Sequence, residues 1–262
     1  MDASLASPAP PRGAGSASRL LVGAVAGAWA LATAAQVAGA GAMLHHDGLI
    51  EGRLPLEVAL GLSLAAWLLM VVAMMLPSSL PVVALFAHAS RGQPHARSAF
   101  AAFLAGYGLV WLTFGAAAFL FDALVHAAVD AWPWLAHNEW LIGGGVLVVA
   151  GAFQFTSLKY ACLDSCRSPG AFLLRHYARG RRAALRIGAR HGLFCVGCCW
   201  ALMLVLFAVG VANLVWMAAL TAVMVHEKTR PSGRDGVAVT GVALLALASI
   251  VLAWGASGTG AG

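Results

Sequence analysis

Five cysteines in two groups are the residues of this sequence that are best suited to chemistry. Their positions are Cys162, Cys166, Cys195, Cys198 and Cys199. Thiolates are soft ligands that suit Cu(I), Zn(II) and iron–sulfur chemistry. An odd number of cysteines argues against a framework made of disulfides alone. The grouping therefore indicates metal binding or thiol redox chemistry.

A histidine stands one helical turn before the second group. In a helix, four side chains would fall at i, i+4, i+7 and i+8: His191, Cys195, Cys198 and Cys199. They would share an arc of roughly 100° on one face, and imidazole is a ligand for copper and zinc. Gly192 and Gly197 remove bulk there and would let another helix approach closely. Cys162 and Cys166, spaced i,i+4, would also share a face. The alternative is packing alone, because cysteine is a small apolar residue and the spacing matches no zinc ribbon.

Methionines near the middle of an apolar stretch could add soft ligands. Met70 and Met74 are one helical turn apart, and Met75 follows. Thioethers bind Cu(I) without a buried charge, so they suit a path through lipid. Pro77 and Pro81 remove backbone donors, and the two serines after Pro77 can satisfy freed carbonyls, so we expect a kink. Ordinary core packing is the alternative interpretation.

Charged and imidazole groups near predicted helix ends are weaker candidates. Glu227 and Lys228 are adjacent at the end of an apolar stretch, where we expect them to snorkel to the membrane surface. At the mouth of a metal path, this pair would instead capture a cation or shuttle protons. His45, His46 and Asp47 fall in a predicted outer loop and could receive a metal there, although exposed histidine pairs are often incidental.

Composition predicts the elements that must position these groups. Of 262 residues, 61% are hydrophobic and 10% are charged, whereas a soluble domain carries about a quarter. Uncharged apolar runs of about 20 residues match the hydrocarbon core of a bilayer, where only helices satisfy their own backbone. The sequence therefore predicts an all-α polytopic transmembrane helical bundle. It has no P-loop motif, which argues against an ATPase, and no apparent Ser/His/Asp arrangement for hydrolysis.

We expect one transmembrane domain over 19–255, between a disordered tail at 1–18 and a flexible tail at 256–262. The predicted helices cover 19–43, 58–87, 98–127, 139–160, 191–210, 212–226 and 237–255. The sixth is short, so six helices with a re-entrant hairpin are the alternative to seven. The apolar run of the first helix is long for a cleaved signal peptide, which favours an uncleaved span.

Basic residues predict the orientation of this bundle. With the N-terminus inside and seven spans, all 16 lysines and arginines except Arg53 lie on the cytoplasmic side, as the positive-inside rule requires. We therefore expect N-in, C-out topology. Both cysteine groups then lie at the reducing side, where structural disulfides are rare. The net charge of +6 is explained by topology and anionic lipid, so we expect no nucleic-acid partner.

Three stretches resemble a bacterial family of predicted metal-binding integral membrane proteins, a domain of unknown function. They are WLLMVVAMMLPSSLP at 67–81, LKYACLDSCRSP at 158–169 and GARHGLFCVGCCW at the start of 188–228. The resemblance covers about residues 60–230 and implies a multi-pass protein of the bacterial inner (plasma) membrane. It implies that the family pattern includes Met74, Met75, Pro77, Cys162, Cys166, His191, Cys195, Cys198, Cys199 and Glu227. One departure is Ala212, where the family commonly has methionine, a further soft ligand.

From these observations we expect a transition metal, with Cu(I) favoured over zinc, bound by a Cys/His group on the cytoplasmic side. The expected ligand set is Cys162, Cys166, His191, Cys195, Cys198, Cys199, Met70, Met74, Met75 and Glu227. The protein would be a transporter or would deliver metal, with the lipid bilayer and a cuproenzyme or another membrane subunit as partners. An enzyme is the less favoured class. The alternatives are a membrane oxidoreductase or thiol-redox subunit of a larger complex, and a structural subunit.

Overall fold

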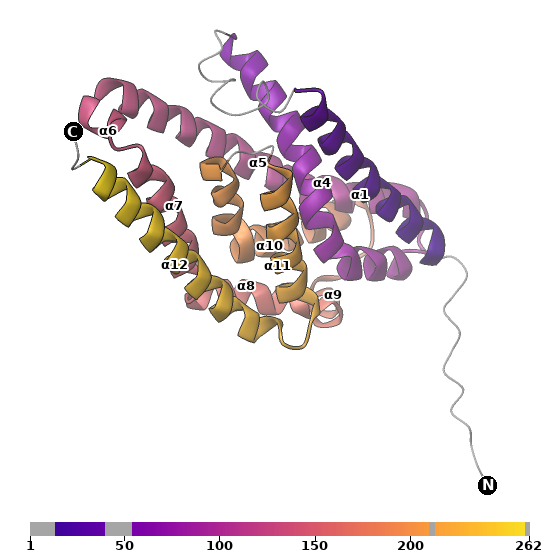
Figure 1. Cartoon of the computed structure of the whole chain (residues 1–262). Helices are drawn as coiled ribbons and strands as arrows, with labels where there is room; N and C mark the ends of the chain where they lie inside the picture. The colour runs from indigo at the N-terminus through magenta and orange to yellow at the C-terminus, as the bar shows by residue number, and fades with distance from the viewer. Residues whose placement is uncertain (1–13, 40–53, 210–212, 260–262) are drawn as a thin grey trace.

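The computed structural model describes residues 14–39, 54–209 and 213–259, and the regular structure within these ranges is entirely helical (Figure 1). This confirms the all-α prediction. The helices in chain order are α1 (Ala14–Val37), α4 (Leu56–Ala89), α5 (Ala96–Ala131), α6 (Pro133–Ala136), α7 (Trp140–Phe153), α8 (Ser157–Arg167), α9 (Pro169–His176), α10 (Arg181–Val209), α11 (Leu214–Thr229) and α12 (Gly233–Thr259).

Five of the described helices are long and apolar enough to cross a membrane. These stretches are Arg19–Val37, Leu56–Ala89, Ala96–Ala131, Arg181–Leu206 and Gly233–Ser257. α7 and α8 meet the same criterion as a pair, bent by 65° at the break between them. α11 has 16 residues, fewer than the about 20 that a span needs. The seven spans and their orientation therefore stay predictions.

The break between α7 and α8 corrects the continuous helix expected over 139–160. α7 ends at Phe153, and α8 begins at Ser157 after Thr156, whose backbone is extended. The hydroxyl of Thr156 accepts a hydrogen bond from the backbone N–H of Lys159 at 3.2 Å, which caps the new helix. Apolar composition does not reveal this cap, so the sequence pattern missed the turn that places the first cysteine pair.

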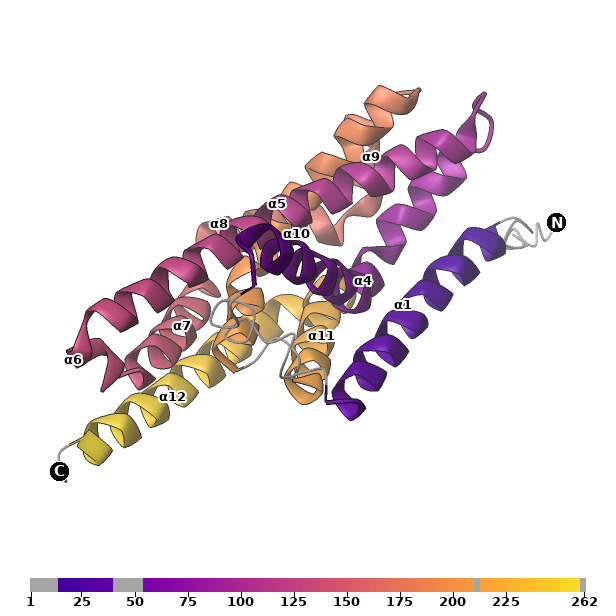
Figure 2. The ribbon, with the colours of Figure 1, turned by 90° about the horizontal axis from the view of Figure 1, so that it is seen from above.

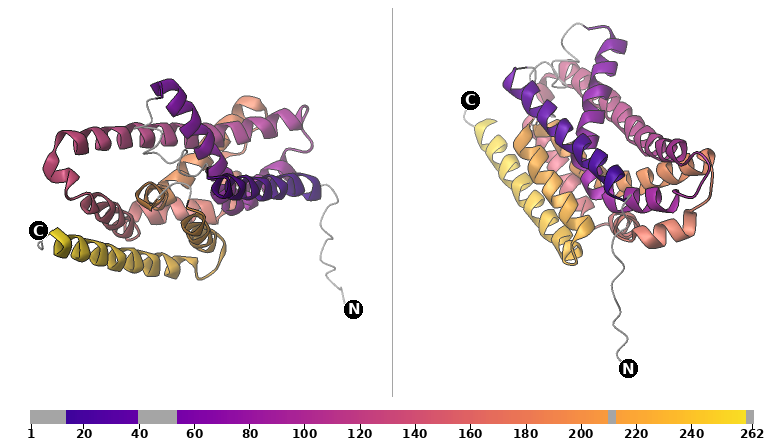
Figure 3. Two further views of the ribbon diagram at one scale, coloured as in Figure 1. Left: turned by 45° about the horizontal axis from the view of Figure 1, so that its top comes forward. Right: turned by 90° about the vertical axis from the view of Figure 1, so that its right-hand side faces the viewer.

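α10 begins at Arg181, earlier than the start expected near 191. Arginine is a good helix former, and the apolar criterion overlooked this basic extension. α10 occupies the centre, because it packs against α5, α7, α8 and α11. In the most apolar stretch of α10, 56% of the residues are buried inside the bundle, compared with 11% in that of α1. α1 pairs with α4 and α12 pairs with α7, and both lie at the periphery (Figures 2 and 3).

Glycines bring the backbones of α5 and α10 together. A Cβ built on Gly106 would collide with the carbonyl oxygen of Leu185, and one on Gly188 would collide with that of Phe103. Small residues permit this approach between helices. The contact fixes α10, which carries three of the cysteines, against α5.

α4 is a single helix of 34 residues that contains Pro77 and Pro81. It changes direction along its length (Figures 1 and 2), as prolines inside a helix predict. Pro77 frees the carbonyl of Ala73, which accepts from the indole N–H of Trp29 on α1 at 3.1 Å rather than from a serine. The hydroxyl of Ser78 donates to the carbonyl of Met75 at 2.9 Å, which neither proline frees. The bend lies in the part of α4 that approaches the cysteines.

Some expectations fall partly or wholly outside the described residues. They concern tail residues 1–13 and 260–262, positions 40–43 of the first predicted helix, the group His45, His46 and Asp47, and Ala212. Within the described part, α1 begins at Ala14 and α12 ends at Thr259. Both helices therefore extend further into the predicted tails than the sequence indicated.

Candidate metal centre

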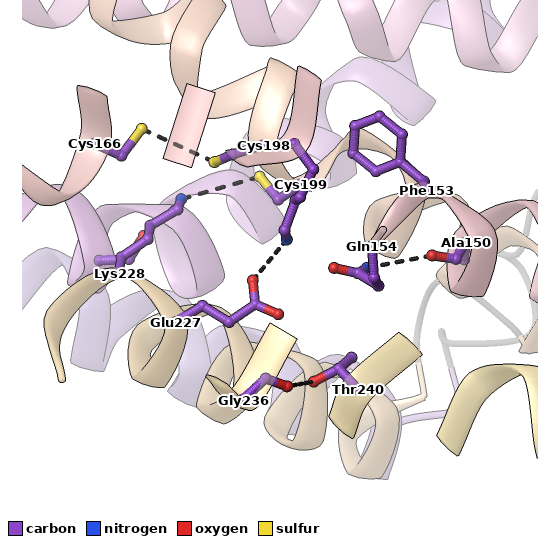
Figure 4. A network of polar contacts seen from close by, with 12 residues as sticks. Ala150, Phe153, Gln154, Cys166, Cys198, Cys199, Glu227, Lys228, Gly236 and Thr240 are labelled. Carbon is purple, nitrogen blue, oxygen red and sulfur yellow. Dashed lines mark hydrogen bonds and ion pairs between the residues drawn. The ribbon is translucent and has the colours of Figure 1, made fainter. Parts of the chain in front are cut away.

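Sulfur atoms from three helices meet in the interior of the bundle. All five cysteines are buried and free of disulfides. The Sγ of Cys166 on α8 lies 3.9 Å from the Sγ of Cys198 on α10 (Figure 4). The Sγ of Cys199 lies 3.6 Å from the Sδ of Met75 on α4. We call the group formed by Cys166, Cys195, Cys198, Cys199 and Met75 the sulfur cluster.

An ammonium group lies against this cluster. The Nζ of Lys228, near the end of α11, is 3.2 Å from the Sγ of Cys195 and 4.0 Å from the Sγ of Cys199. Figure 4 shows Lys228 reaching toward Cys199. The same Nζ donates to the hydroxyl of Ser78 at 3.1 Å. Cys195 also lies 3.2 Å from the hydroxyl of Tyr107. A cationic group and a hydroxyl therefore both contact one thiol.

The glycines of α10 make room for the helices that supply these groups. A Cβ on Gly197 would lie 2.5 Å from the Sγ of Cys162, so Cys162 points from α8 toward α10. A Cβ on Gly192 would lie 3.0 Å from the Cβ of Val110 and 3.2 Å from the carbonyl oxygen of Tyr107 on α5. This confirms that both glycines admit a neighbouring helix. Cys162 thus borders the sulfur cluster.

Glu227 is paired with a lysine rather than placed among the sulfurs. Its Oε2 accepts from the Nζ of Lys159 on α8 at 2.6 Å, and their side chains are 2% and 0% exposed. Arg167 donates to the backbone carbonyl of Glu227 and, at 2.8 Å, to that of Arg230. The expectation that Glu227 and Lys228 snorkel to the surface is therefore wrong. Both are buried because α8 supplies a partner charge and covers the end of α11.

His191 lies among aromatic rings. Its ring centroid is 5.5 Å from those of Tyr107 and Phe172 and 6.4 Å from that of Phe103. Neither ring nitrogen has a hydrogen-bond partner in the described part of the chain. Tyr107 thus contacts His191 with its ring and Cys195 with its hydroxyl. Helical spacing correctly placed His191 near the cysteines, but the structure gives it an aromatic environment.

The three methionines of α4 have different surroundings. Met70 and Met74 are buried in the hydrophobic core cluster that also contains the cysteines. Met75 belongs to the same core and makes the 3.6 Å sulfur contact with Cys199. The structure therefore brings Met75 into the sulfur cluster and gives Met70 and Met74 core packing.

The donor set consists of soft ligands. Over the described residues, no group of three or more His, Cys, Asp and Glu side chains is arranged to hold a metal ion. Structural zinc sites are closed tetrahedra of such ligands. Pairs of sulfur atoms remain, and such soft groups suit Cu(I), zinc and iron–sulfur clusters. The thioether of Met75 beside the thiol of Cys199 is a donor pair that fits Cu(I).

Sequence reasoning missed two lysines and a tyrosine at this site. Lys159, Cys162 and Cys166 stand at i, i+3 and i+7, so they share a face of α8. That spacing was the available signal that a charge enters the interior beside the thiols. Lys228 was noticed only as a neighbour of Glu227, and Tyr107 carried no signal that distinguished it from other aromatic residues.

Comparison with known proteins agrees with this chemistry. A protein-family model described as "PpoB2: Copper chaperone" matches residues 64–251, which is more than half of the 262-residue chain. The chain belongs to this family. The PpoB2 match includes the whole sulfur cluster and Lys228, and it supports copper as the metal. It agrees with the metal-related resemblance in the sequence and makes it specific to copper. No curated protein and no solved structure matches the chain.

Proposed function

We propose that this protein is an integral membrane copper chaperone that holds Cu(I) on the sulfur cluster and delivers it to a cuproenzyme. The observation that carries this proposal is the pair of buried sulfur contacts, Cys166–Cys198 at 3.9 Å and Cys199–Met75 at 3.6 Å, inside the region that matches a copper chaperone family. Thiolate and thioether sulfur are soft ligands for Cu(I).

The arrangement of the ligands suits a metal that is passed on. The sulfurs come from three helices, α4, α8 and α10, and form pairs rather than a closed cage. A chaperone must release its cargo, and an incomplete ligand set leaves room for the thiol or imidazole of an acceptor. We infer that Cu(I) moves between neighbouring sulfurs of the cluster before it leaves the protein.

The long apolar helices and the distribution of charge support a membrane setting. We propose a multi-pass protein of the bacterial inner membrane with N-in, C-out topology, because the positive-inside rule places the basic residues in the cytoplasm. The first half of α10 carries Arg181, Arg182, Arg186 and Arg190. Cys195 follows this basic segment closely. The sulfur cluster would thus face copper arriving from the cytoplasmic side.

The test is copper retention by protein purified in detergent without oxygen and loaded with Cu(I). The intact chain should retain near-stoichiometric copper, and a Cys195→Ser/Cys198→Ser/Cys199→Ser variant should lose it. Equal helicity and equal elution on gel filtration would show that the variant is folded. Equal copper in both proteins would refute the proposal. Copper accumulation inside proteoliposomes without an acceptor would indicate transport rather than delivery.

A further inference from the structure

We infer that Lys228 supplies the counter-charge of the copper complex and makes the site selective for a monovalent over a divalent metal ion. This inference rests on the proposed function, and it assigns a specificity-determining role to a residue outside the expected ligand set. Lys228 would act as a positioning residue that contacts the ligands rather than the metal.

The argument begins with the charges buried around the cluster. Lys159 and Glu227 form a pair at 2.6 Å and cancel one another. Lys228 is 6% exposed, and its ammonium group contacts the hydroxyl of Ser78 and the thiols of Cys195 and Cys199. None of these three partners of the ammonium is a carboxylate. A buried cation is costly unless an anion balances it, and here the groups able to become anionic are the thiols.

The charge of a thiolate complex depends on the metal. When Cu(I) binds two cysteine thiols, two protons leave to solvent and the resulting Cu(I) dithiolate carries one negative charge. The same pair of thiols with Zn(II) also releases two protons, but its complex is neutral. The cuprous complex would therefore balance the ammonium of Lys228, whereas the zinc complex would leave it unbalanced in the interior.

The geometry makes this balance effective. The Nζ of Lys228 lies 3.2 Å and 4.0 Å from two sulfurs of the cluster. At such separations, two charges in a buried site interact far more strongly than they do in water. Ser78 anchors the ammonium at 3.1 Å, and Glu227 is turned toward Lys159 rather than toward it. The fold thus holds a positive charge beside the ligands, and the partners described for its ammonium are a hydroxyl and two thiols.

The inference can be tested with the full-length protein in detergent under anaerobic conditions. Cu(I) and Zn(II) affinities would be measured by competition with chelators for the intact chain, Lys228→Met and Lys228→Arg. We expect the ratio of Cu(I) to Zn(II) affinity to fall about a hundredfold in Lys228→Met. Lys228→Arg, which retains the charge, should keep the ratio within about threefold of the intact chain.

A matched control removes the other buried charges. The double variant Lys159→Met/Glu227→Gln deletes a neutral pair that joins α8 to α11. It leaves Ser78, the direct partner of the Lys228 ammonium, in place, and it should leave the ratio unchanged. A mere packing role for Lys228 would weaken both metals together in Lys228→Met and would not be rescued by arginine. An unchanged ratio in Lys228→Met, with copper still bound, would overturn the inference and leave the proposed function standing.

Two further arms separate the remaining cases. Failure of the intact chain to bind Cu(I) would overturn the proposed function itself, and this inference with it. If Lys228→Met does not fold, the intact chain can be tested with Ag(I) and Cd(II), two soft ions of different charge. Clear preference for Ag(I) over Cd(II), measured against a simple dithiol, supports the role of charge, and the same preference as the dithiol contradicts it.

Discussion

The ammonium of Lys159 lies 2.6 Å from the carboxylate of Glu227, with both side chains buried between α8 and α11. This contact joins the helix that carries Cys162 and Cys166 to the helix that carries Lys228. Together with the bonds from Arg167 to the end of α11, it holds the end of α11 against α8. The pair is thus a structural contact between these two helices.

Removing one member of this pair should destabilise the protein. Glu227→Gln leaves the ammonium of Lys159 buried without a counter-charge, which costs about 3 kcal/mol. The double variant Lys159→Met/Glu227→Gln has no such charge and should regain most of that stability. Thermal unfolding in detergent, followed by circular dichroism, measures both. A single variant as stable as the intact chain would show that the pair does not hold α8 to α11.

The close contact between α5 and α10 predicts different effects for two neighbouring glycines. Gly106→Ala places a methyl group against the backbone of α10, and such overpacking costs about 2 kcal/mol. Gly108 on the same helix has no atom within 4 Å of an added Cβ. Gly108→Ala should therefore change the stability by less than about 1 kcal/mol. Thermal unfolding compares them, and equal effects would contradict the helix contact described above.

Gly197 allows a test of whether Cys162 is a ligand or packs beside the cluster. In Gly197→Ala the new Cβ would lie 2.5 Å from the Sγ of Cys162, so the Cys162 thiol must rotate or α8 must move away from α10. We expect a Cu(I) affinity about tenfold lower, because either shift disturbs the sulfurs beside Cys198. Adding Cys162→Ala removes the collision and should restore binding. If the double variant binds no better than Gly197→Ala, Cys162 is itself required for the metal.

The two closest cysteines of α8 and α10 should form a disulfide under forced oxidation. Their sulfurs are 3.9 Å apart, and a small side-chain movement brings them to the bonded distance of about 2 Å. We expect diamide, which takes up two electrons and two protons from the two thiols, to join Cys166 to Cys198 in copper-free protein. Bound Cu(I) should slow the reaction. Peptide mass spectrometry identifies the bond, and joining of Cys198 to Cys199 instead would contradict the arrangement.

The sequence predicted the all-α class and the approach of His191 to the α10 cysteines, because these depend on composition and on helical spacing. Long apolar runs can be satisfied in lipid only as helices, and the i, i+4, i+7 and i+8 spacing put His191 near the α10 cysteines. The turn before Ser157 depends on one threonine cap. In a prediction from sequence, a single capping residue is a weaker signal than the apolar run that surrounds it.

The contacts between helices could not be read from the sequence. Periodicity says which residues share a face, but it does not say which helix that face meets. For this reason His191 was grouped with the thiols, although Phe103, Tyr107 and Phe172 surround it. Lys228 was assigned to the surface, although α4 and α10 enclose its ammonium. The surroundings of His191 and of Lys228 are both set by contacts with residues that are far away in the sequence.

The most direct test is X-ray absorption at the copper edge of Cu(I)-loaded protein. We predict an edge typical of Cu(I) and a first shell made of sulfur alone, with loss of sulfur neighbours in Cys198→Ser and Cys199→Ser. His191→Ala should leave the shell unchanged, because its ring packs among aromatic side chains. A shell that contains nitrogen or oxygen, or one that the cysteine variants do not alter, would contradict copper binding by the sulfur cluster.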